Sequence, residues 1–555
     1  MSRIRTWNIE LDSTFDTGAG IQLRSPEPGI VTFLAPWDGS PLPMWFHFRI
    51  RGAKGWRVRF VLANANRCLG GPSGYAKLRV RPVVTEDPPT MRPSRRRWRR
   101  VPKEDISYTE QTGQFQFEVN IRSDEAYVAH CYPYGLAEWD ELVADFKASP
   151  CLATSTIGQT ERGRPMPHAQ ITEGKPDDKR VIWLTARHHS GETSGGWALD
   201  GTLRWLLSDD DKAKHLRQRY VFRVMPFADL DGVVEGLYGK ERAPHDFNRA
   251  YLEDTPRPEI AHFLDAFCAM GDRNLAFFDY HSPDAGGQHQ VFMRYRGATS
   301  QRRVEICQEY GDALVALSPK RSKLEAKDVR EPLYQGDEGE TTSTGGTYLT
   351  GRIISMTNEV SYALTADDHV LTRRDYRAYG AAIGKAYHRL LSAHEAEIDA
   401  GGWRESEQDI KPFADYKGTA FIGAFQWVPL RDVKLSADAD AKGEVLRARL
   451  LKNSASAQIA GPLRKLGRKK ALQLAWRFTP QTKKAKLRAL ATIFYYGPRG
   501  LRYWRDEKLT LDTTSGEWQT CRVQLHPPKG ARTVRVSLRL EGGRGLFEWR
   551  AAEAL

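Results

Sequence analysis

The sequence predicts a central α/β domain, with a mixed sheet and helices on both faces, flanked by an N-terminal β-sandwich and a C-terminal, jelly-roll-like β-sandwich. Alternating apolar and polar residues fill the first part of the chain, a pattern typical of half-buried strands. From Val181, short apolar strands alternate with helical stretches, which indicates a sheet covered by helices. Strand alternation then returns. We therefore predict domains at 1–137, 138–400 and 412–555.

The N-terminal strands are predicted from period-two alternation. Apolar and polar side chains alternate in 46–50, 56–62 and 115–119, and Gly and Pro residues separate these segments. Each strand would bury one face, so we expect an antiparallel sandwich.

The middle elements are predicted from short apolar runs and from helical spacing. Tyr376, Tyr379, Ile383, Tyr387 and Leu390 are three or four residues apart, as on one face of a helix. The expected strands are Val181–Ala186, Tyr220–Phe227, Asn274–Tyr280 and Ile353–Tyr362, and the expected helices are Thr193–Leu207 and one that begins near Thr372.

The C-terminal part again shows strand alternation, in 472–478 and 534–540. Trp504, Trp518 and Trp549 suggest either a stacking platform for carbohydrate or the filling of a β-core. The second interpretation is favoured, because large aromatic side chains are mostly buried.

Composition limits the class of protein. The 555 residues are 40% hydrophobic and 27% charged, which is typical of a globular chain. No apolar stretch is long enough to span a membrane, the start lacks the pattern of a secretory signal, and the six cysteines are scattered without a CxxC pair. We therefore expect a soluble cytoplasmic protein. The net charge of +14 fits acidic substrates or simple solubility, and without a recognisable module we expect no nucleic-acid partner.

Candidate metal ligands follow two of the predicted strands. His189 and Glu192 lie three residues apart on a turn that enters a helix, so they can face the same way. His281 ends another strand, where α/β sheets bind ligands. Imidazole and carboxylate are common zinc ligands in catalytic sites. His188 has the wrong spacing to replace His189, and His289 is a rival to His281 in a glycine-rich stretch.

Two more features suit a peptidase site. Asn248 and Arg249 follow a strand, and an arginine beside an amide can bind a carboxylate. Glu359 lies within an apolar strand, where a carboxylate is costly unless it is used, for example as a general base. Each feature alone is also explained by capping, surface pairing or a strand edge.

Together, in this order and at this spacing, these features resemble the zinc carboxypeptidase family. The segment Asp231–Arg249, the strand Trp45–Phe48 and the motif Tyr132–Tyr134 are similar to the cytosolic carboxypeptidase branch. One departure is clear: that family places an oxyanion-stabilising arginine where this chain has Gly239.

The resemblance implies one Zn²⁺ per chain, held by His189, Glu192 and His281. It also implies that Glu359 is the catalytic base. Asn248 and Arg249 would then bind the terminal carboxylate of a substrate, and Lys240 or Arg242 would replace the missing arginine.

The implied function is that of a zinc metallocarboxypeptidase, a hydrolase of the metalloprotease type. It would release C-terminal amino acids from the tail of a peptide or protein by zinc-activated water. Acidic tails are reasonable substrates, since that branch often removes glutamate, and no membrane partner is expected. The alternatives are a degenerate zinc-binding protein that has lost catalysis, because of Gly239, and a hydrolase of cell-wall peptides.

Overall fold

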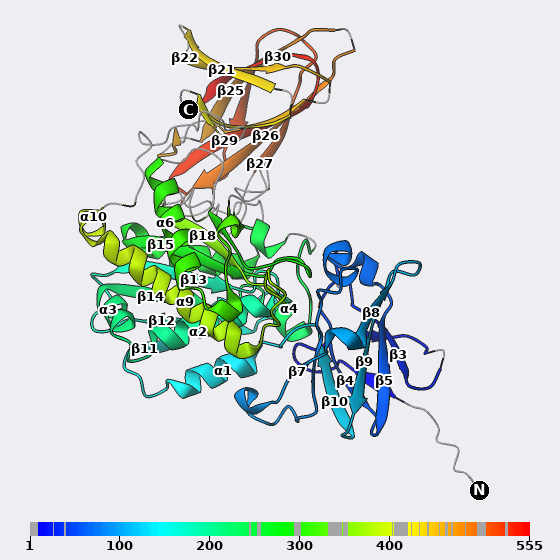
Figure 1. Cartoon of the computed structure of the whole chain (residues 1–555). Coiled ribbons are helices and arrows are strands. Elements are labelled where there is room, and N and C mark those ends of the chain that lie inside the picture. The colour runs from blue at the N-terminus through cyan, green and yellow to red at the C-terminus, as the bar shows by residue number, and fades with distance from the viewer. Residues whose placement is uncertain are drawn as a thin grey trace.

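The structure is a computed structural model of the whole chain (Figure 1). The residues that it describes are 9–25, 27–37, 40, 42–242, 246–251, 257–293, 301–330, 344, 347, 353–401, 403, 420–422, 425–431, 433–440, 443–453, 455–460, 464–467, 470–482, 484–496, 507–527 and 531–554. None of the helices in these ranges is long and apolar enough to cross a membrane.

The N-terminal part forms two five-stranded sheets, in the orders β1-β4-β10-β6-β7 and β2-β3-β5-β9-β8. The strands are β1 (Glu10–Asp12), β2 (Ile21–Gln22), β3 (Ile30–Leu34), β4 (His47–Arg51), β5 (Trp56–Leu62), β6 (Val83–Thr85), β7 (Arg99–Arg100), β8 (Ile106–Thr109), β9 (Gln114–Ile121) and β10 (Glu125–Ala129). Phe33, Phe48 and Phe117, from both sheets, pack in one core. The expectation of purely antiparallel pairing is wrong, because β3 and β5 run parallel.

The middle part is an eight-stranded mixed sheet in the order β11-β12-β14-β13-β15-β18-β16-β17. Its strands are β11 (Leu152–Gln159), β12 (Pro165–Ile171), β13 (Arg180–Ala186), β14 (Tyr220–Met225), β15 (Asn274–His281), β16 (Gln290–Met293), β17 (Val329–Arg330) and β18 (Ile354–Glu359). Its helices are α1 (Leu136–Asp145), α2 (Thr193–Leu206), α3 (Asp211–Arg219), α4 (Leu230–Glu235), α5 (Pro258–Met270), α6 (Gln301–Leu317), α9 (Arg373–Ala393) and α10 (Glu395–Asp399).

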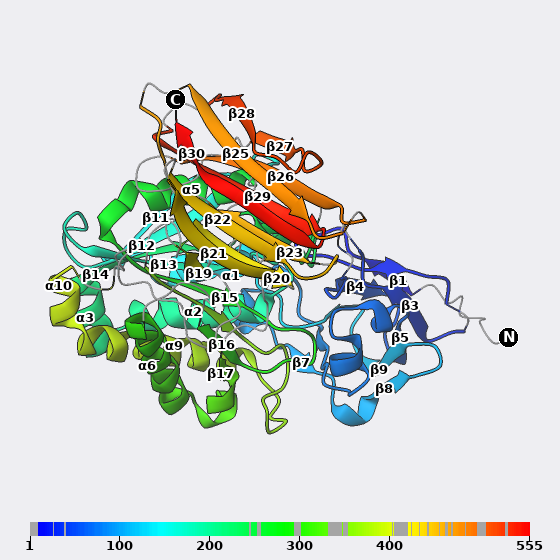
Figure 2. The same ribbon diagram turned by 90° about the horizontal axis from the view of Figure 1, so that it is seen from above.

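Helices cover both faces of this sheet, as the sequence predicts (Figure 2). Alternate residues of β13 face opposite ways: Ile182 and Leu184 share a core with α2 and α9, whereas Val181 and Trp183 share another with α5. All five apolar residues expected on one face of α9 are buried. The alternation follows from the period of two along a strand.

The sheet has a topological switch point beside β13. The chain adds β14 on one side of β13 and then β15 on the other, and all three strands are parallel. β18 continues the parallel set beside β15. Loops that leave the carboxyl ends of neighbouring parallel strands diverge at such a point and form a crevice where ligands bind.

Two glycine contacts bring α2 and α9 close together. A Cβ on Gly380 would lie 1.9 Å from the Ala198 carbonyl oxygen, and one on Gly201 would lie 2.3 Å from the Arg377 carbonyl oxygen. Any larger side chain would push the two helices apart, so glycine sets this helix spacing.

The N-terminal sheets are tied to the middle domain by hydrogen bonds. Arg100 of β7 donates to the carbonyl oxygens of Leu371 and Tyr362 and to the Tyr376 hydroxyl, at 2.7–2.8 Å. Ser73 donates to Asp284 in the loop after β15, at 3.1 Å. The N-terminal part therefore supports loops that leave the carboxyl edge of the central sheet.

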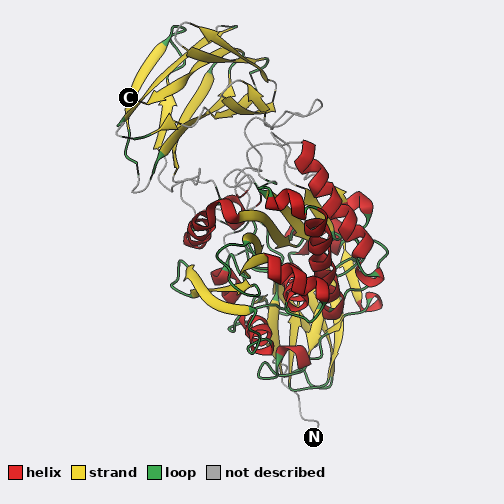
Figure 3. Cartoon of the chain, turned by 90° about the vertical axis from the view of Figure 1, so that its left-hand side faces the viewer, coloured by secondary structure: helices red, strands yellow, loops and turns green. Residues whose placement is uncertain are grey.

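The C-terminal part consists of strands and loops, with no helix among its described residues (Figure 3). It has its own core. One sheet has the order β19-β20-β23-β29-β26-β27, with β24 beside β29, and the other has the order β21-β22-β30-β25-β28. The strands are β19 (Ala420–Ile422), β20 (Phe425–Arg431), β21 (Val433–Asp440), β22 (Gly443–Leu450), β23 (Ser456–Ala460), β24 (Arg464–Lys465), β25 (Ala471–Pro480), β26 (Leu487–Tyr496), β27 (Glu507–Leu511), β28 (Gln519–Gln524), β29 (Thr533–Gly542) and β30 (Gly545–Ala554).

The three tryptophans that suggest a stacking platform differ in their surroundings. Trp549 is buried in the core, which agrees with the core-filling interpretation. Trp518 is half-buried outside that core, and the guanidinium groups of Arg477 and Arg550 lie over its ring. Trp504 lies outside the described residues.

Candidate active site

His189 and Glu192 occupy the turn between β13 and α2. Glu192 is the residue before the first turn of α2, and one of its carboxylate oxygens lies 2.7 Å from His189 Nδ1. The other nitrogen of the ring, Nε2, lies 3.1 Å from both oxygens of Asp246. The His189 ring is therefore fixed between two carboxylates, with Nδ1 directed at Glu192.

His281 reaches the same carboxylate from the end of β15. Its Nδ1 lies 2.8 Å from the second oxygen of Glu192, and its Nε2 lies 2.7 Å from Asp279. The ligand atoms of His189, Glu192 and His281 all lie within 4.8 Å of one another, and the three residues are 0–2% exposed. The structure thus brings together the three residues that the sequence pattern selects.

The charges around these residues suit a cation. Burial lowers the pKa of His281, but Asp279 and Glu192 outweigh it and raise this pKa well above its usual value. Burial raises the pKa of Glu192, but His189 and His281 outweigh it and lower this pKa below its usual range. Asp246 and Glu192 likewise outweigh burial and raise the pKa of His189. The buried carboxylates thus favour positive charge at this site, and a metal ion would supply it in place of protons on the two imidazoles. Two imidazoles and a carboxylate are a donor set that fits zinc.

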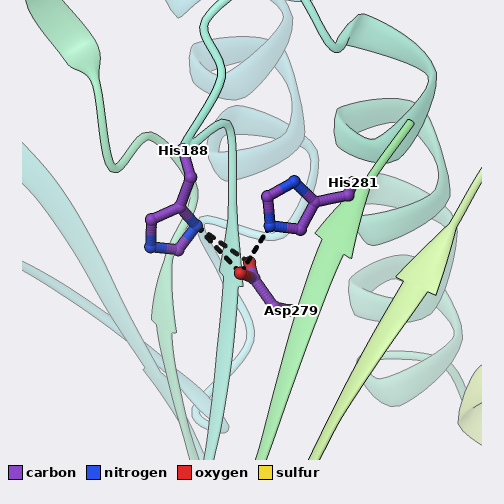
Figure 4. A group of neighbouring side chains, drawn as sticks. All are labelled: His188, Asp279 and His281. Atoms are coloured by element: carbon purple, nitrogen blue, oxygen red, sulfur yellow. Dashed lines mark hydrogen bonds and ion pairs between the residues drawn. The ribbon is translucent and has the colours of Figure 1, made fainter. Parts of the chain in front are cut away.

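A second group of possible ligands shares His281. His188 Nδ1 lies 3.0 Å from Asp279, and Asp279 also accepts from His281 Nε2 (Figure 4). A histidine that binds a metal commonly donates its other ring N–H to a carboxylate. Asp279 has this relation to His281, and Asp246 has it to His189, so we assign both as supporting carboxylates.

Glu359 ends β18 directly beside His281, since these two residues are paired in the register of β15 and β18. Its Oε2 is buried and has no hydrogen-bond partner among the described residues. Burial raises the pKa of Glu359 to about 7, and the negative charge of Glu192 adds to this rise, whereas His281 and Lys240 oppose it. An unsatisfied carboxylate oxygen beside a possible metal site is suited to accept a proton from water.

Asn248 and Arg249 lie on a short turn that is linked to the metal group. The turn, η5 (Phe247–Arg249), is capped by Asp246, which accepts from the backbone N–H of Asn248 at 2.7 Å. Asp246 is also the carboxylate beside His189 Nε2. Asn248 and Arg249 are themselves partly exposed, as residues that meet a substrate need to be.

The position of the missing arginine is closed to any side chain. Gly239 has a φ of +88°, and a Cβ there would lie 2.7 Å from Ser190 Oγ and 2.8 Å from Ser190 N. Glycine is required by this left-handed conformation and by the close approach. A cation that stabilises an oxyanion at this site would have to come from another residue.

Lys240 and Arg242 have different surroundings. Arg242 Nη1 lies 3.0 Å from Asp229, which is fully buried, and its guanidinium lies over the Phe247 ring. Lys240 is partly exposed and close enough to Glu359 to oppose the rise in its pKa. Arg242 is thus engaged in a buried ion pair, whereas Lys240 lies near the candidate base.

His289, the rival ligand, lies away from the metal group. Its ring stacks on Tyr379, and Nδ1 accepts from the Ser361 backbone N–H at 3.2 Å. Burial lowers its pKa to about 3, so it is a neutral histidine within the packed interior.

Two functional carboxylates were missed from the sequence. Asp279 precedes His281 by two residues, so both side chains lie on one face of β15, and this spacing was an available signal. Asp246 was noted only as part of the Asn248-Arg249 motif. Its contact with His189 depends on the fold and has no local signal.

Two histidines and a glutamate at the carboxyl edge of an α/β sheet are an arrangement by which metallohydrolases hold their metal. Residues 136–312 match the zinc carboxypeptidase family, and residues 11–131 match the cytosolic carboxypeptidase N-terminal domain. The resemblance to the zinc carboxypeptidase family that the motifs indicate is therefore confirmed.

Two relatives give the extent of this similarity. The chain is 31% identical over 344 residues to cytosolic carboxypeptidase 2 of Danio rerio, a match that covers 56% of this chain and 44% of the relative. It is 27% identical over 323 residues to an uncharacterized protein of Zymomonas mobilis. This second match covers 55% of this chain and 79% of that protein. The chain thus spans less than half the length of the cytosolic carboxypeptidase that it matches.

Solved structures share the fold. A metallo-carboxypeptidase from Burkholderia cenocepacia superposes with a TM-score of 0.60 at 22% identity, over 69% of this chain and 99% of that one. A metallo-carboxypeptidase from Pseudomonas aeruginosa, in complex with (2-guanidinoethylmercapto)succinic acid, gives 0.57 at 20% identity, with 69% and 99% covered. These likenesses establish a carboxypeptidase-like α/β fold preceded by an N-terminal domain.

Proposed function

We propose that this protein is a zinc metallocarboxypeptidase that removes single residues from the C-termini of peptides or proteins. The observation that carries the proposal is the convergence of His189, Glu192 and His281 beside the unsatisfied carboxylate of Glu359. In a protein that had lost catalysis, the buried carboxylate group of Glu359 would only destabilise the fold. Its presence beside a complete ligand set therefore argues against a degenerate peptidase.

In this proposal His189, Glu192 and His281 hold one zinc ion. Bound there, zinc would supply Lewis acidity, which polarises a carbonyl group and makes water more acidic. Asp246 and Asp279 keep the two imidazole rings oriented, because each lies within hydrogen-bond distance of an Nε2 atom.

Glu359 is the general base of this proposal. Its buried Oε2 has no competing partner among the described residues, so it is available to take a proton from water and later return it to the leaving amine. The bound cation would lower the pKa of Glu359 from about 7 and keep the carboxylate ionised at neutral pH.

Arg249 and Asn248 provide the specificity for a free C-terminus. A guanidinium can form two parallel hydrogen bonds with a carboxylate, and the adjacent amide can add a third. Because Asp246 both caps this turn and contacts His189, the carboxylate-binding residues are held at a fixed distance from the metal ligands. A fixed distance favours cleavage of the last peptide bond only.

Lys240 is the better candidate for stabilising the oxyanion. Arg242 would have to leave Asp229 to serve, and a buried carboxylate without its partner is strongly unfavourable. Lys240 lies next to Gly239, whose position is closed to an arginine, and it is close enough to Glu359 to oppose the rise in the pKa of that carboxyl group. We therefore assign the oxyanion role to Lys240 and a structural role to Arg242.

Acidic tails are the proposed substrates, and the cytoplasm is the proposed location. A net charge of +14 attracts acidic peptides electrostatically. The relatives named cytosolic carboxypeptidases support the location.

The test is the metal content of the purified protein, together with the release of C-terminal amino acids from a peptide panel that includes oligoglutamate. The proposal expects about one zinc per chain and chelator-sensitive release of single residues. Zinc without release would favour a degenerate binding protein, and preferred cleavage of cell-wall peptides would favour the other alternative. A protein without zinc would contradict the ligand assignment.

A further inference from the structure

A buried row of hydrogen bonds runs from Tyr251 to the metal group. The Tyr251 hydroxyl lies 2.7 Å from His188 Nε2, and His188 Nδ1 lies 3.0 Å from Asp279. Asp279 in turn lies 2.7 Å from His281 Nε2. Figure 4 shows His188 and His281 on opposite sides of the Asp279 carboxylate, with both rings directed at it. All four residues are at most 2% exposed.

The carboxylate of Asp279 determines which groups donate hydrogen bonds in this row. Ionised Asp279 only accepts, so His188 Nδ1 and His281 Nε2 must both donate to it. Because Nδ1 of His188 donates to Asp279, its Nε2 is the nitrogen that can accept from the Tyr251 hydroxyl. His281 likewise donates from Nε2, so Nδ1, the atom that faces Glu192, is the nitrogen that can give its lone pair to a metal. The row therefore selects the tautomer of His281 that can bind a metal.

The row is held by regular structure. His188 follows β13, and Asp279 and His281 lie on β15, the parallel strand next to it. Thr185 of β13 pairs with Asp279 in the strand register and donates to it from Oγ1, at 2.8 Å. The rings of His188 and His281 are nearly parallel, at 14°, with their centres 5.5 Å apart.

We propose that His188 is a positioning residue for zinc: through Asp279 it fixes the orientation and tautomer of His281. The inference rests on the proposed zinc site, and it adds a residue that the motif of metal ligands does not contain. Tyr251 lies two residues after Arg249, so the same row also connects the metal ligand to the segment that carries the proposed carboxylate clamp.

A second metal ion among His188, Asp279 and His281 is the competing explanation. It would require His281 to bind a metal through each ring nitrogen, with Nε2 deprotonated. The present arrangement instead gives Asp279 three hydrogen-bond donors, from Thr185, His188 and His281, and such a carboxylate is already satisfied.

The test compares two amides at position 188 in the full chain. In His188→Asn the amide nitrogen falls near the position of Nδ1 and can still donate to Asp279, whereas in His188→Gln it falls near Nε2 and cannot. Zinc affinity is measured by competition with a chromogenic chelator, and zinc stoichiometry is measured on the same samples. Tyr280→Phe is the matched control, because it removes a buried hydroxyl that contacts Thr202 and Tyr387, on the same strand but outside the row.

We expect His188→Gln to weaken zinc binding by about 10- to 100-fold, the usual effect of losing a supporting partner. His188→Asn and Tyr280→Phe should stay within about threefold of the parent protein, a range we set well below that loss. The absorption spectrum of the cobalt-substituted protein should change in His188→Gln alone. A general loss of folding would instead lower the melting temperature of the metal-free variants without this pattern in affinity.

Equal zinc affinity in all variants would overturn the inference, as would two metals per chain of which one is lost on changing His188. A parent protein that binds no zinc would overturn it together with the proposed function. The expected affinity pattern without any peptide release would support the role of His188 while contradicting the peptidase activity.

Discussion

The residues of the candidate site differ in their contacts, and these contacts indicate a different role for each. The two histidines share one carboxylate, Glu192, through their Nδ1 atoms, while each outer Nε2 atom has a carboxylate of its own. Neighbouring residues of like charge differ in their surroundings: Arg242 pairs with buried Asp229, and Lys240 lies near Glu359. Mutations at these positions should therefore separate catalysis, binding and stability.

Replacing Glu359 with Gln should abolish turnover and leave zinc binding intact. The amide keeps the shape of the side chain but cannot accept the proton from water, and a general base contributes about 10²- to 10⁴-fold in rate. The measurement is kcat on a good peptide substrate beside zinc content. Activity close to that of the parent protein would show that another group is the base.

Replacing Arg249 with Ala should raise KM far more for peptides with a free C-terminal carboxylate than for the matching C-terminal amides. A hydrogen bond to a charged group contributes about 1.5–3 kcal/mol, so a loss of at least tenfold is expected for the free acids. The amide series is the internal control. Equal changes in both series would refute the carboxylate clamp.

Lys240→Ala and Arg242→Ala should have opposite profiles. Loss of the oxyanion cation should lower kcat by about 10²- to 10³-fold with little change in stability. Loss of Arg242 leaves Asp229 buried without its partner and should cost about 3–5 kcal/mol of the free energy of unfolding. Urea unfolding and steady-state kinetics on both variants check this, and a reversed pattern would exchange the two roles.

At the scale of elements, the α2–α9 contact helps to determine where Glu192 lies, because Glu192 is the residue directly before the first turn of α2. Gly380 and Gly201 set the distance between the two helices. The position of a metal ligand thus depends on glycines that are far from it in sequence.

Gly380→Ala should destabilise the protein, although alanine is normally the better helix former by about 1 kcal/mol. The added methyl group would meet the Ala198 carbonyl oxygen at 1.9 Å, and overpacking of this kind costs about 1–3 kcal/mol. Zinc affinity should fall as well, because α2 moves. Ala381→Gly, a partly exposed position on the same helix, is the control and should leave zinc affinity unchanged. A stabilised Gly380→Ala variant would contradict the close contact.

The strands and helices of the middle domain could largely be predicted, because their apolar patterns are strong. The ends could not: the predicted strands 220–227 and 353–362 end at Met225 and Glu359, since the apolar residues that follow continue into packed loops. The parallel pairing of β3 with β5 has no signal in a period-two pattern. Likewise the motifs selected His189, Glu192 and His281, which the structure brings together, whereas the pairing of Arg242 with Asp229 has no signal in the sequence.

At the scale of the whole molecule, the N-terminal sheets support the site. Arg100 reaches the carbonyl oxygen of Tyr362, three residues after Glu359, and Ser73 holds the loop that follows His281. Glu359 and His281 are thus supported by a part of the chain that contributes none of the proposed ligands. The domain boundaries at residues 137, 400 and 412 stay predictions.

Arg100→Ala should lower the free energy of unfolding by at least about 2 kcal/mol, because it leaves buried carbonyl groups without a donor. It should also reduce activity, because Arg100 holds Tyr362, which closely follows the strand that ends at Glu359. Arg99→Ala is the matched control: Arg99 is exposed and pairs with Glu86 at 3.4 Å, so its loss should cost under about 0.5 kcal/mol. Urea unfolding measures the free energy of unfolding of both variants. Equal losses in the two would contradict the proposal that Arg100 links the N-terminal sheets to the site.

The pairing of β13, β15 and β18 also determines the order in which the proposed metal ligands come together during folding. The pair His189–Glu192 forms with one turn of chain, but His281 arrives only when β15 docks beside β13, about ninety residues later in the sequence. Two ligands make a weak chelate, so a nascent chain would hold zinc loosely until the sheet is nearly complete. Zinc would then mainly slow the unfolding of the protein, and it would contribute little to the folding nucleus.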